Sequence, residues 1–192
     1  PKKSLNILRK TNALLEGHFV LSSGLHSSKY IQCAKLLSFP DKAEKICKSL
    51  ANKIKKNFTK IDLILAPAIG GIVIGYEIGR ILKKETIFCE RVKGRFVLRR
   101  GFKIKKGSKV LIVEDVITTG KSSMECVKLV KKAKASIIGF ASIIDRSTKR
   151  SLKIKKRIIS HLKIDVPTYK SNSLPSELKL IPITTPGSRF IK

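Results

Sequence analysis

The segment richest in chemically useful side chains runs from Val110 to Ser123, with the sequence VLIVEDVITTGKSS. Its first four residues are apolar, which predicts a buried strand that stops at two adjacent carboxylates, Glu114 and Asp115. A short loop rich in hydroxyl groups follows, where Gly120 lets the backbone approach a ligand closely, and a helix is predicted to begin at Lys121. Backbone N–H groups of such a loop bind phosphate, and carboxylates accept hydrogen bonds from sugar hydroxyls. The pattern therefore favours a ribose 5-phosphate site.

Two other phosphate-binding patterns fit this segment poorly. Gly120-Lys121-Ser122 matches the end of a Walker A loop, but Asp115 stands where that loop requires a glycine. The dinucleotide-binding pattern G-x-G-x-x-G is absent from the sequence. A structural alternative remains open, in which the acids face solvent at the end of a strand and Thr119 or Ser122 only caps the helix.

The elements that must position these residues alternate between strands and helices. Apolar periodicity predicts helices over 5–15, 41–57, 71–82 and 121–132, and strands over 63–66, 86–90, 109–113, 137–144 and 158–164. A basic hairpin is expected over 92–100, around Gly94. The alternation indicates an α/β fold with a doubly wound, mostly parallel sheet flanked by helices, which binds ligands at the carboxyl ends of its strands. No linker or repeat divides the sequence, so we expect one domain over 1–192.

The charge of the chain is unusually positive, at +29 over 192 residues. Lysine accounts for 32 of the 42 basic residues, aromatic residues make up 6%, and tryptophan is absent. A platform that stacks nucleic-acid bases needs aromatic side chains among the cations, and this sequence does not interleave them. We therefore expect mostly solvated basic faces, some steering of anionic substrates, and no nucleic-acid partner.

Neither a membrane span nor a protein-built metal centre is expected. The longest uncharged stretch, 63–76, is shorter than the about 20 apolar residues that cross a bilayer, and the first residues lack the apolar core of a signal peptide. Cytoplasm is the expected location. The four cysteines form no C-x-x-C pair and are expected to be reduced and buried, and the three histidines are expected to be structural or at the surface.

The run VLIVEDVITTGKSS resembles the phosphoribosyl diphosphate (PRPP) signature of type I phosphoribosyltransferases. The resemblance implies that the two acids bind the ribose hydroxyls, that the loop after them binds the 5′-phosphate, and that the segment 67–71, PAIGG, binds diphosphate. The implied PRPP-binding residues are Glu114, Asp115, Val116, Ile117, Thr118, Thr119, Gly120, Lys121 and Ser122, and the implied diphosphate loop consists of Ala68, Ile69, Gly70 and Gly71.

Three further segments resemble the orotate-specific members of that family, of the bacterial short-loop type. They are EGHFVLSSGLHSSKY at 16–30, ERVKGRFVLRRGF at 90–102, and PGSR at 186–189. The first implies an N-terminal hood over 1–35, and the second a mobile catalytic loop over 91–100. The implied reaction is transfer of the phosphoribosyl group from PRPP to orotate, giving orotidine 5′-monophosphate in pyrimidine (UMP) synthesis.

The same resemblance implies roles for individual residues and partners. Arg91, Lys93 and Arg95 are the candidate catalytic cations, since they would neutralise the departing diphosphate. Thr118 and Arg146 would bind orotate. Mg²⁺ would be held by substrate oxygens, with the protein contacting it only indirectly through Asp115. The chain is expected to form a homodimer with shared active sites. The alternatives are a purine-type phosphoribosyltransferase and a PRPP-sensing regulator that binds nucleic acid.

Overall fold

The computed structural model describes residues 2–21, 23–148 and 152–186. The chain divides into two compact units, one formed by Pro1–Phe39 with Asp165–Lys192 and the other by Pro40–Ile164. The hood segment expected over 1–35 therefore belongs to the first unit, together with the chain from Asp165 onward. Ser22 and the residues from Gly187 onward, which include most of the PGSR segment, lie outside the described residues.

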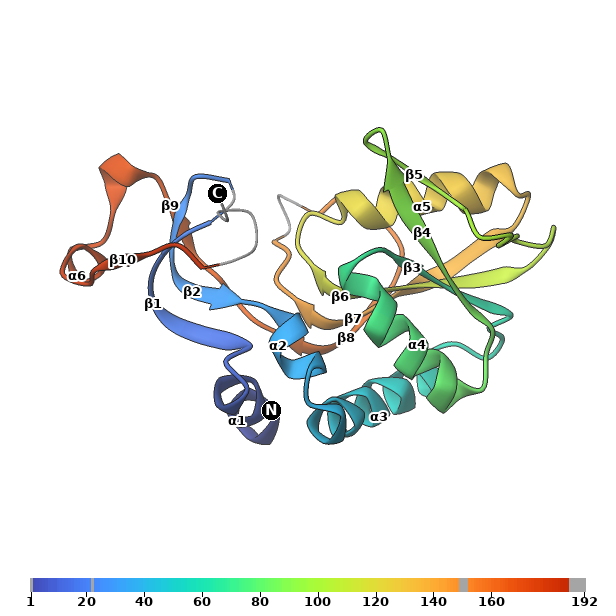
Figure 1. Cartoon of the computed structure of the whole chain (residues 1–192), viewed down its shortest axis with the longest axis horizontal. Coiled ribbons are helices and arrows are strands. Elements are labelled where there is room, and N and C mark those ends of the chain that lie inside the picture. The colour runs from blue at the N-terminus through green and yellow to red at the C-terminus, as the bar shows by residue number, and fades with distance from the viewer. Residues whose placement is uncertain (1, 22, 149–151, 187–192) are drawn as a thin grey trace. The chain divides into compact units, whose positions relative to one another are not determined.

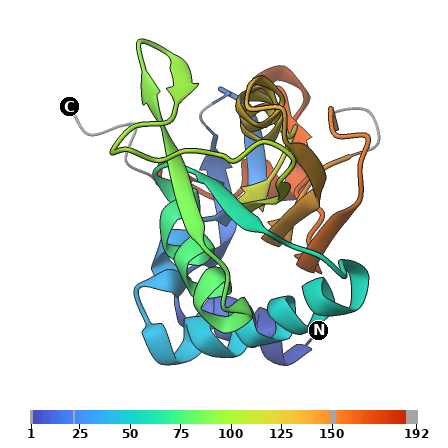
Figure 2. The same cartoon turned by 90° about the vertical axis from the view of Figure 1, so that its right-hand side faces the viewer.

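A six-stranded sheet forms the centre of the second unit, with the strand order β5-β4-β3-β6-β7-β8 (Figures 1 and 2). Its strands are β3 (Leu63–Pro67), β4 (Thr86–Val92), β5 (Arg95–Val97), β6 (Lys109–Ile117), β7 (Ser136–Asp145) and β8 (Ile158–Lys163). All neighbouring pairs are parallel except β4 and β5, which run antiparallel. The predicted α/β fold with a mostly parallel sheet is confirmed.

Three helices cover the faces of this sheet. Helices α3 (Pro40–Asn57) and α4 (Gly70–Leu82) lie on one face and α5 (Lys121–Lys132) on the other (Figure 1). Each helix was predicted from its apolar stripe to within one residue of its observed bounds. Because both faces are covered, the central strands are mostly apolar, and Leu65, Leu111 and Ile112 are completely buried.

Strand β6 was predicted to end before the two acids, and this prediction was wrong. The strand does not stop at Val113 but continues through both carboxylates to Ile117. The extension is stabilised by ladder pairing with β7, in which Glu114 lies opposite Ser142 and Ile117 opposite Asp145. The acids are therefore fixed within a strand instead of following it.

The first unit contains a four-stranded sheet in the order β10-β1-β2-β9. Its elements are α1 (Lys2–Lys10), β1 (Leu14–Val20), β2 (His26–Ile31), α2 (Cys33–Leu37), β9 (Thr168–Tyr169), the 3-10 turn η1 (Ser171–Ser173), α6 (Ser176–Lys179) and β10 (Ile183–Thr184). Two of the four strands, β9 and β10, come from the C-terminal segment. A buried contact of 2.7 Å joins ring nitrogens of His18 and His26, two of the histidines that were expected to be structural or at the surface.

The helix predicted over 5–15 was wrong in its second half, because the chain turns after Lys10. Asn12 adopts the left-handed conformation with φ 55°, and the hydroxyl of Thr11 donates to the carbonyl oxygens of Ile7 and Leu8. These bonds satisfy carbonyl groups at the helix end. Leu14 then enters β1, so its burial reflects a strand and not the helical stripe.

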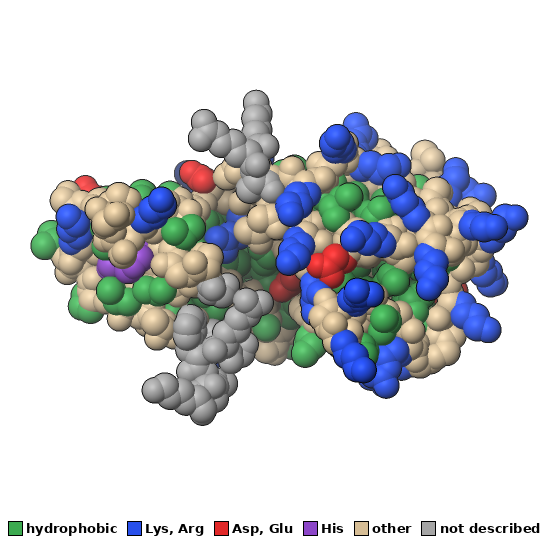
Figure 3. Space-filling view, turned by 90° about the horizontal axis from the view of Figure 1, so that it is seen from above, with side chains coloured by type: hydrophobic (Ala, Val, Ile, Leu, Met, Phe, Trp, Pro, Cys, Tyr) green, Lys and Arg blue, Asp and Glu red, His purple; other side chains and the backbone are tan. Residues whose placement is uncertain are grey.

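The four cysteines are reduced and buried, as expected. Among the described residues, no helix is long and apolar enough to cross a membrane. Figure 3 shows that Lys and Arg side chains are spread over the visible face of the six-stranded unit, with hydrophobic side chains between them.

Candidate functional site

The two acids of β6 have different environments because successive side chains of a strand point to opposite faces. Glu114 is buried and accepts a short hydrogen bond from the hydroxyl of Ser123, which is itself buried on α5. Burial raises the pKa of Glu114 to about 7, while the bond from Ser123 opposes the increase. Ser123 was not predicted to contact Glu114, because the preference of serine for the start of a helix does not indicate which face of α5 it occupies.

Asp115 is only partly buried, and one of its oxygens accepts a hydrogen bond of 2.9 Å from the backbone N–H of Val116. Burial raises the pKa of this carboxyl, and the backbone bond opposes the increase. Asp115 therefore lies partly exposed near the carboxyl end of the central strand. That is the position from which a carboxylate can accept hydrogen bonds from a sugar.

The predicted diphosphate loop lies directly beside Asp115. The loop follows β3, contains a cis peptide bond between Ala68 and Ile69, and leads into α4 at Gly70. A Cβ atom placed on Gly70 would lie 2.9 Å from Oδ2 and 3.0 Å from Oδ1 of Asp115. Gly71 is also closely packed, since a Cβ there would lie 3.1 Å from Cδ of Pro67 and 3.2 Å from the carbonyl oxygen of Val113. The glycines thus bring one loop against the acid of another strand.

The hydroxyl-rich loop after β6 ends in a turn that only glycine accommodates well. Gly120 has φ 73°, and a Cβ on it would lie 2.7 Å from Cγ1 of Ile154. Thr118 and Thr119 are exposed, and α5 begins at the next residue, Lys121. The loop therefore presents hydroxyl groups and the positive end of a helix dipole at the same edge as the acids.

Arg146 follows β7 and lies beside the start of this loop. Its backbone N–H donates to the carbonyl oxygen of Ile117 over 2.9 Å. Its guanidinium group is half-buried, burial lowers its pKa, and Nε has no hydrogen-bond partner among the described residues. The neighbouring Asp145 accepts a bond from the backbone of Ser147, so a structural turn is present as well. A half-buried cation with an unused donor is suited to an anionic ligand.

The basic hairpin expected over 92–100 is present, with Lys93 and Gly94 forming its two-residue turn. Both have positive φ, 48° and 77°, as the tight turn of a hairpin requires. Arg91 does not extend freely into solvent. It contacts Glu125 of α5 at 2.9 Å, donates to the carbonyl oxygen of Gly94 at 2.8 Å, and lies 4.2 Å from the centre of the Phe96 ring.

The structure therefore brings together, at one edge of the sheet, four of the segments that the sequence predicted for the site. These are the acids of β6, the loop that follows them, the glycines at the start of α4, and Arg146. Arg95 of the hairpin lies near Lys121 of that loop, since both line one pocket. Arg91 is engaged by Glu125, and Lys93 and Arg95 are exposed.

No group of three or more His, Cys, Asp or Glu side chains suited to a metal ion is found within residues 2–21, 23–148 and 152–186. Magnesium ions in proteins often take oxygen ligands from substrates and water. The partly exposed carboxylate of Asp115, beside the open backbone of Gly70, is compatible with such an ion because Mg²⁺ prefers oxygen ligands and retains several waters.

The chain is similar in sequence to known phosphoribosyltransferases. A family model described as "Phosphoribosyl transferase domain" matches residues 39–172. The orotate phosphoribosyltransferase of Parvibaculum lavamentivorans is 44% identical over 191 residues, which cover 99% of this chain and 98% of that protein. The orotate phosphoribosyltransferase of Caldicellulosiruptor saccharolyticus is 45% identical over 188 residues, with coverage of 98% and 97%.

Solved structures show the same fold at lower identity. Orotate phosphoribosyltransferase from Aeropyrum pernix superimposes with a TM-score of 0.68 at 22% identity, covering 83% of this chain and 92% of that one. Adenine phosphoribosyltransferase from Thermoanaerobacter pseudethanolicus gives a TM-score of 0.61 at 19% identity, with coverage of 71% and 88%. At these identities the solved structures support the fold alone. The relatives that match over nearly the full length of the chain are orotate phosphoribosyltransferases.

Proposed function

The chain belongs to the phosphoribosyl transferase family, among its orotate phosphoribosyltransferases, and we propose that the site at the carboxyl edge of its sheet carries out that reaction. The phosphoribosyl group of PRPP is transferred to N1 of orotate, with release of diphosphate. The observation that carries the residue assignment is the approach of Gly70 to Asp115, because it joins a diphosphate loop to a ribose-binding acid.

PRPP binding is assigned to the segments on either side of that approach. Glu114 and Asp115 accept hydrogen bonds from the ribose 2′ and 3′ hydroxyls, as charged acceptors that bind more strongly than neutral ones. The loop from Val116 to Ser122 binds the 5′-phosphate at the start of α5. The segment from Ala68 to Gly71 binds the diphosphate through its backbone.

Orotate recognition is assigned to Arg146 and Thr118. Orotate differs from uracil by a carboxylate on C6, and a guanidinium group binds a carboxylate through two parallel hydrogen bonds. Arg146 is bonded through its backbone to Ile117, the residue before Thr118, so both side chains lie at one end of the phosphate loop. The Nε atom of Arg146, which lacks a partner among the described residues, supports this role.

Magnesium is the proposed cofactor, and it would neutralise the diphosphate that leaves. Asp115 is the residue placed to contact its water shell, and no protein-built cage is required. Negative charge grows on the leaving group as the bond to C1 breaks, so cations placed there stabilise the transition state more than the ground state. Lys93 and Arg95 are available for this task, while Arg91 would first have to exchange Glu125 for the diphosphate.

A homodimer with shared sites is the proposed assembly. On one side of α4, the large apolar side chains of Ile69, Val73 and Tyr76 are exposed by 86%, 52% and 66%, and such a group is typical of a subunit interface. Mixing a chain in which Arg91, Lys93 and Arg95 are alanine with a Glu114→Gln/Asp115→Asn chain tests the sharing. Partial recovery of activity is expected, because one hybrid site then carries neither defect. Inactive mixtures despite demonstrated subunit exchange would exclude sharing.

A spectrophotometric assay of orotate consumption tests the proposed reaction directly. The protein is incubated with PRPP, Mg²⁺ and orotate, and parallel reactions contain hypoxanthine or uracil instead. Turnover with orotate at roughly 1–1000 per second is expected, with far lower rates for the other bases. A preference for hypoxanthine would leave the PRPP site standing but refute the base assignment. Salt-sensitive binding of RNA without any turnover would instead indicate a regulator.

A further inference from the structure

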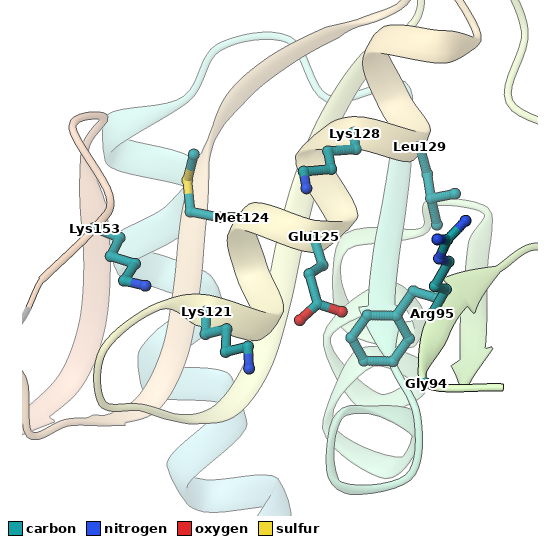
Figure 4. Close-up of a pocket in the computed structure, with 9 residues that line it drawn as sticks. Gly94, Arg95, Lys121, Met124, Glu125, Lys128, Leu129 and Lys153 are labelled. Atoms are coloured by element: carbon teal, nitrogen blue, oxygen red, sulfur yellow. The ribbon is translucent and has the colours of Figure 1, made fainter. Parts of the chain in front are cut away.

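A pocket of about 630 Å³ lies between the β4–β5 hairpin, one side of α5 and the chain around Lys153 (Figure 4). Lys121, Glu125 and Lys128 line it from successive turns of α5, since residues spaced by three or four share one side of a helix. Arg95 lines it from the hairpin. The pocket is therefore built by three segments that are distant in the sequence.

Four cations line this pocket, namely Arg95, Lys121, Lys128 and Lys153. Their side chains make no ion pair within the part of the chain that the structure describes. Glu125 is the acid in the lining, and it already contacts Arg91 at 2.9 Å. The pocket consequently has a net positive charge, and mutual repulsion among its cations falls when an anion binds between them.

The rest of the lining is apolar. Phe96, Met124 and Leu129 contribute side chains to it, and Phe96 is buried beneath the guanidinium group of Arg91 at 4.2 Å from the ring centre. A single phosphate would leave most of this volume unfilled. The lining fits a longer anion, particularly one that carries an apolar group.

We propose that this pocket binds the oligophosphate chain of an anionic ligand such as a nucleoside triphosphate. The phosphates contact Lys121, Lys128 and Lys153, and a base or other ring packs on an apolar part of the lining. The site is additional to the transfer reaction. Lys121 contributes its backbone to the proposed phosphate loop and its side chain to this pocket, so occupancy of one site would affect the other.

A matched pair of lysine variants distinguishes binding in this pocket from general attraction to a basic surface. Lys128 and Lys132 lie one turn apart on α5 and are both exposed, but only Lys128 lines the pocket. Lys128→Ala and Lys132→Ala therefore remove the same charge from the same helix. Lys153→Ala removes a cation from a different segment. None of these three residues belongs to the proposed transfer site.

Isothermal titration calorimetry with uridine 5′-triphosphate tests the proposal on the full chain, with and without saturating PRPP and Mg²⁺. We expect one binding event that persists in the presence of PRPP. Lys128→Ala and Lys153→Ala should each weaken it by roughly 5–20-fold, between the effects of an exposed ion pair and of a charged hydrogen bond. Lys132→Ala should change it by less than about twofold, and all three variants should retain transferase activity.

The same titration with inorganic triphosphate distinguishes the two sources of oligophosphate. Weaker binding than that of the nucleotide would support a nucleoside ligand, and equal binding would support a free oligophosphate. Equal losses in Lys128→Ala and Lys132→Ala would refute the pocket and indicate non-specific attraction. Competition by PRPP without an effect of Lys128→Ala would place the ligand in the transfer site, and absence of binding at millimolar concentration would also refute the proposal.

Discussion

Replacing Gly70 by alanine tests whether the proposed diphosphate loop and the proposed ribose-binding acid, Asp115, act together. The added methyl carbon would lie 2.9 Å and 3.0 Å from the two carboxylate oxygens of Asp115, closer than a carbon and an oxygen pack. The carboxylate must therefore move, or the loop must withdraw from it. In either case Asp115 loses its alignment with the ribose.

The expected size of the effect follows from the bond that is lost. One hydrogen bond to a charged group contributes roughly 1.5–3 kcal/mol. Its loss corresponds to a PRPP dissociation constant about 10–150-fold higher. Gly70 begins α4 and its φ is not in the left-handed region, so alanine is compatible with its backbone. We therefore expect the melting temperature to change by no more than a few degrees.

Calorimetric titration of PRPP in the presence of Mg²⁺ measures this effect, and a double-mutant cycle with Asp115→Asn provides its control. If Gly70→Ala acts through Asp115, it should cost much less in the Asp115→Asn background than in the native chain. Full additivity of the two substitutions would refute that coupling. An unchanged PRPP affinity in a folded Gly70→Ala protein would refute the proposed geometry altogether.

Three further predictions concern the other side chains of the site. Arg146→Ala should lower kcat/KM for orotate by roughly 10–150-fold while the PRPP dissociation constant hardly changes, and normal handling of orotate would exclude Arg146 from base recognition. PRPP affinity should increase as pH rises through about 7, where Glu114 ionises. Ser123→Ala should move the midpoint of this increase to higher pH, because the carboxylate of Glu114 loses a hydrogen bond. An identical pH profile in both proteins would contradict the role of Ser123. Because the folded-state pKa of Glu114 is raised, stability from this group is present below its ordinary pKa of 4.5 and is lost as pH rises to about 7. Denaturant unfolding should register a loss of up to roughly 3 kcal/mol over that window, and Glu114→Gln should remove it.

Local sequence patterns predicted the elements that carry the site, and the reason is that these elements depend on short-range preferences. The apolar run before Glu114, the glycine at 120 and the amphipathic stripe of α5 each lie within a few residues, so strand, turn and helix could be assigned in order. The end of β6 could not be placed in this way. It continues to Ile117 because β7 supplies ladder partners, and those partners come from another part of the chain.

Contacts between distant segments were settled by the tertiary structure alone. Nothing near Glu114 in the sequence indicates that Ser123 bonds to it, since that contact depends on how α5 packs on the sheet. The engagement of Arg91 by Glu125 has the same origin, and it changes which hairpin cations are available. The N-terminal strands likewise pair with strands from beyond residue 165. The local order of residues in either segment does not indicate that pairing.

The sequence by itself determined the residue types at the site, the order of its elements and, through resemblance, the family. Those features depend on neighbouring residues, whose periodicity and spacing can be read directly. Only the tertiary structure decided that Gly70 lies against Asp115, that Arg146 lies beside the proposed phosphate loop, and that four cations line one pocket. The physical reason is that parallel strands far apart in sequence end at a common edge, where packing and strand register fix which side chains meet.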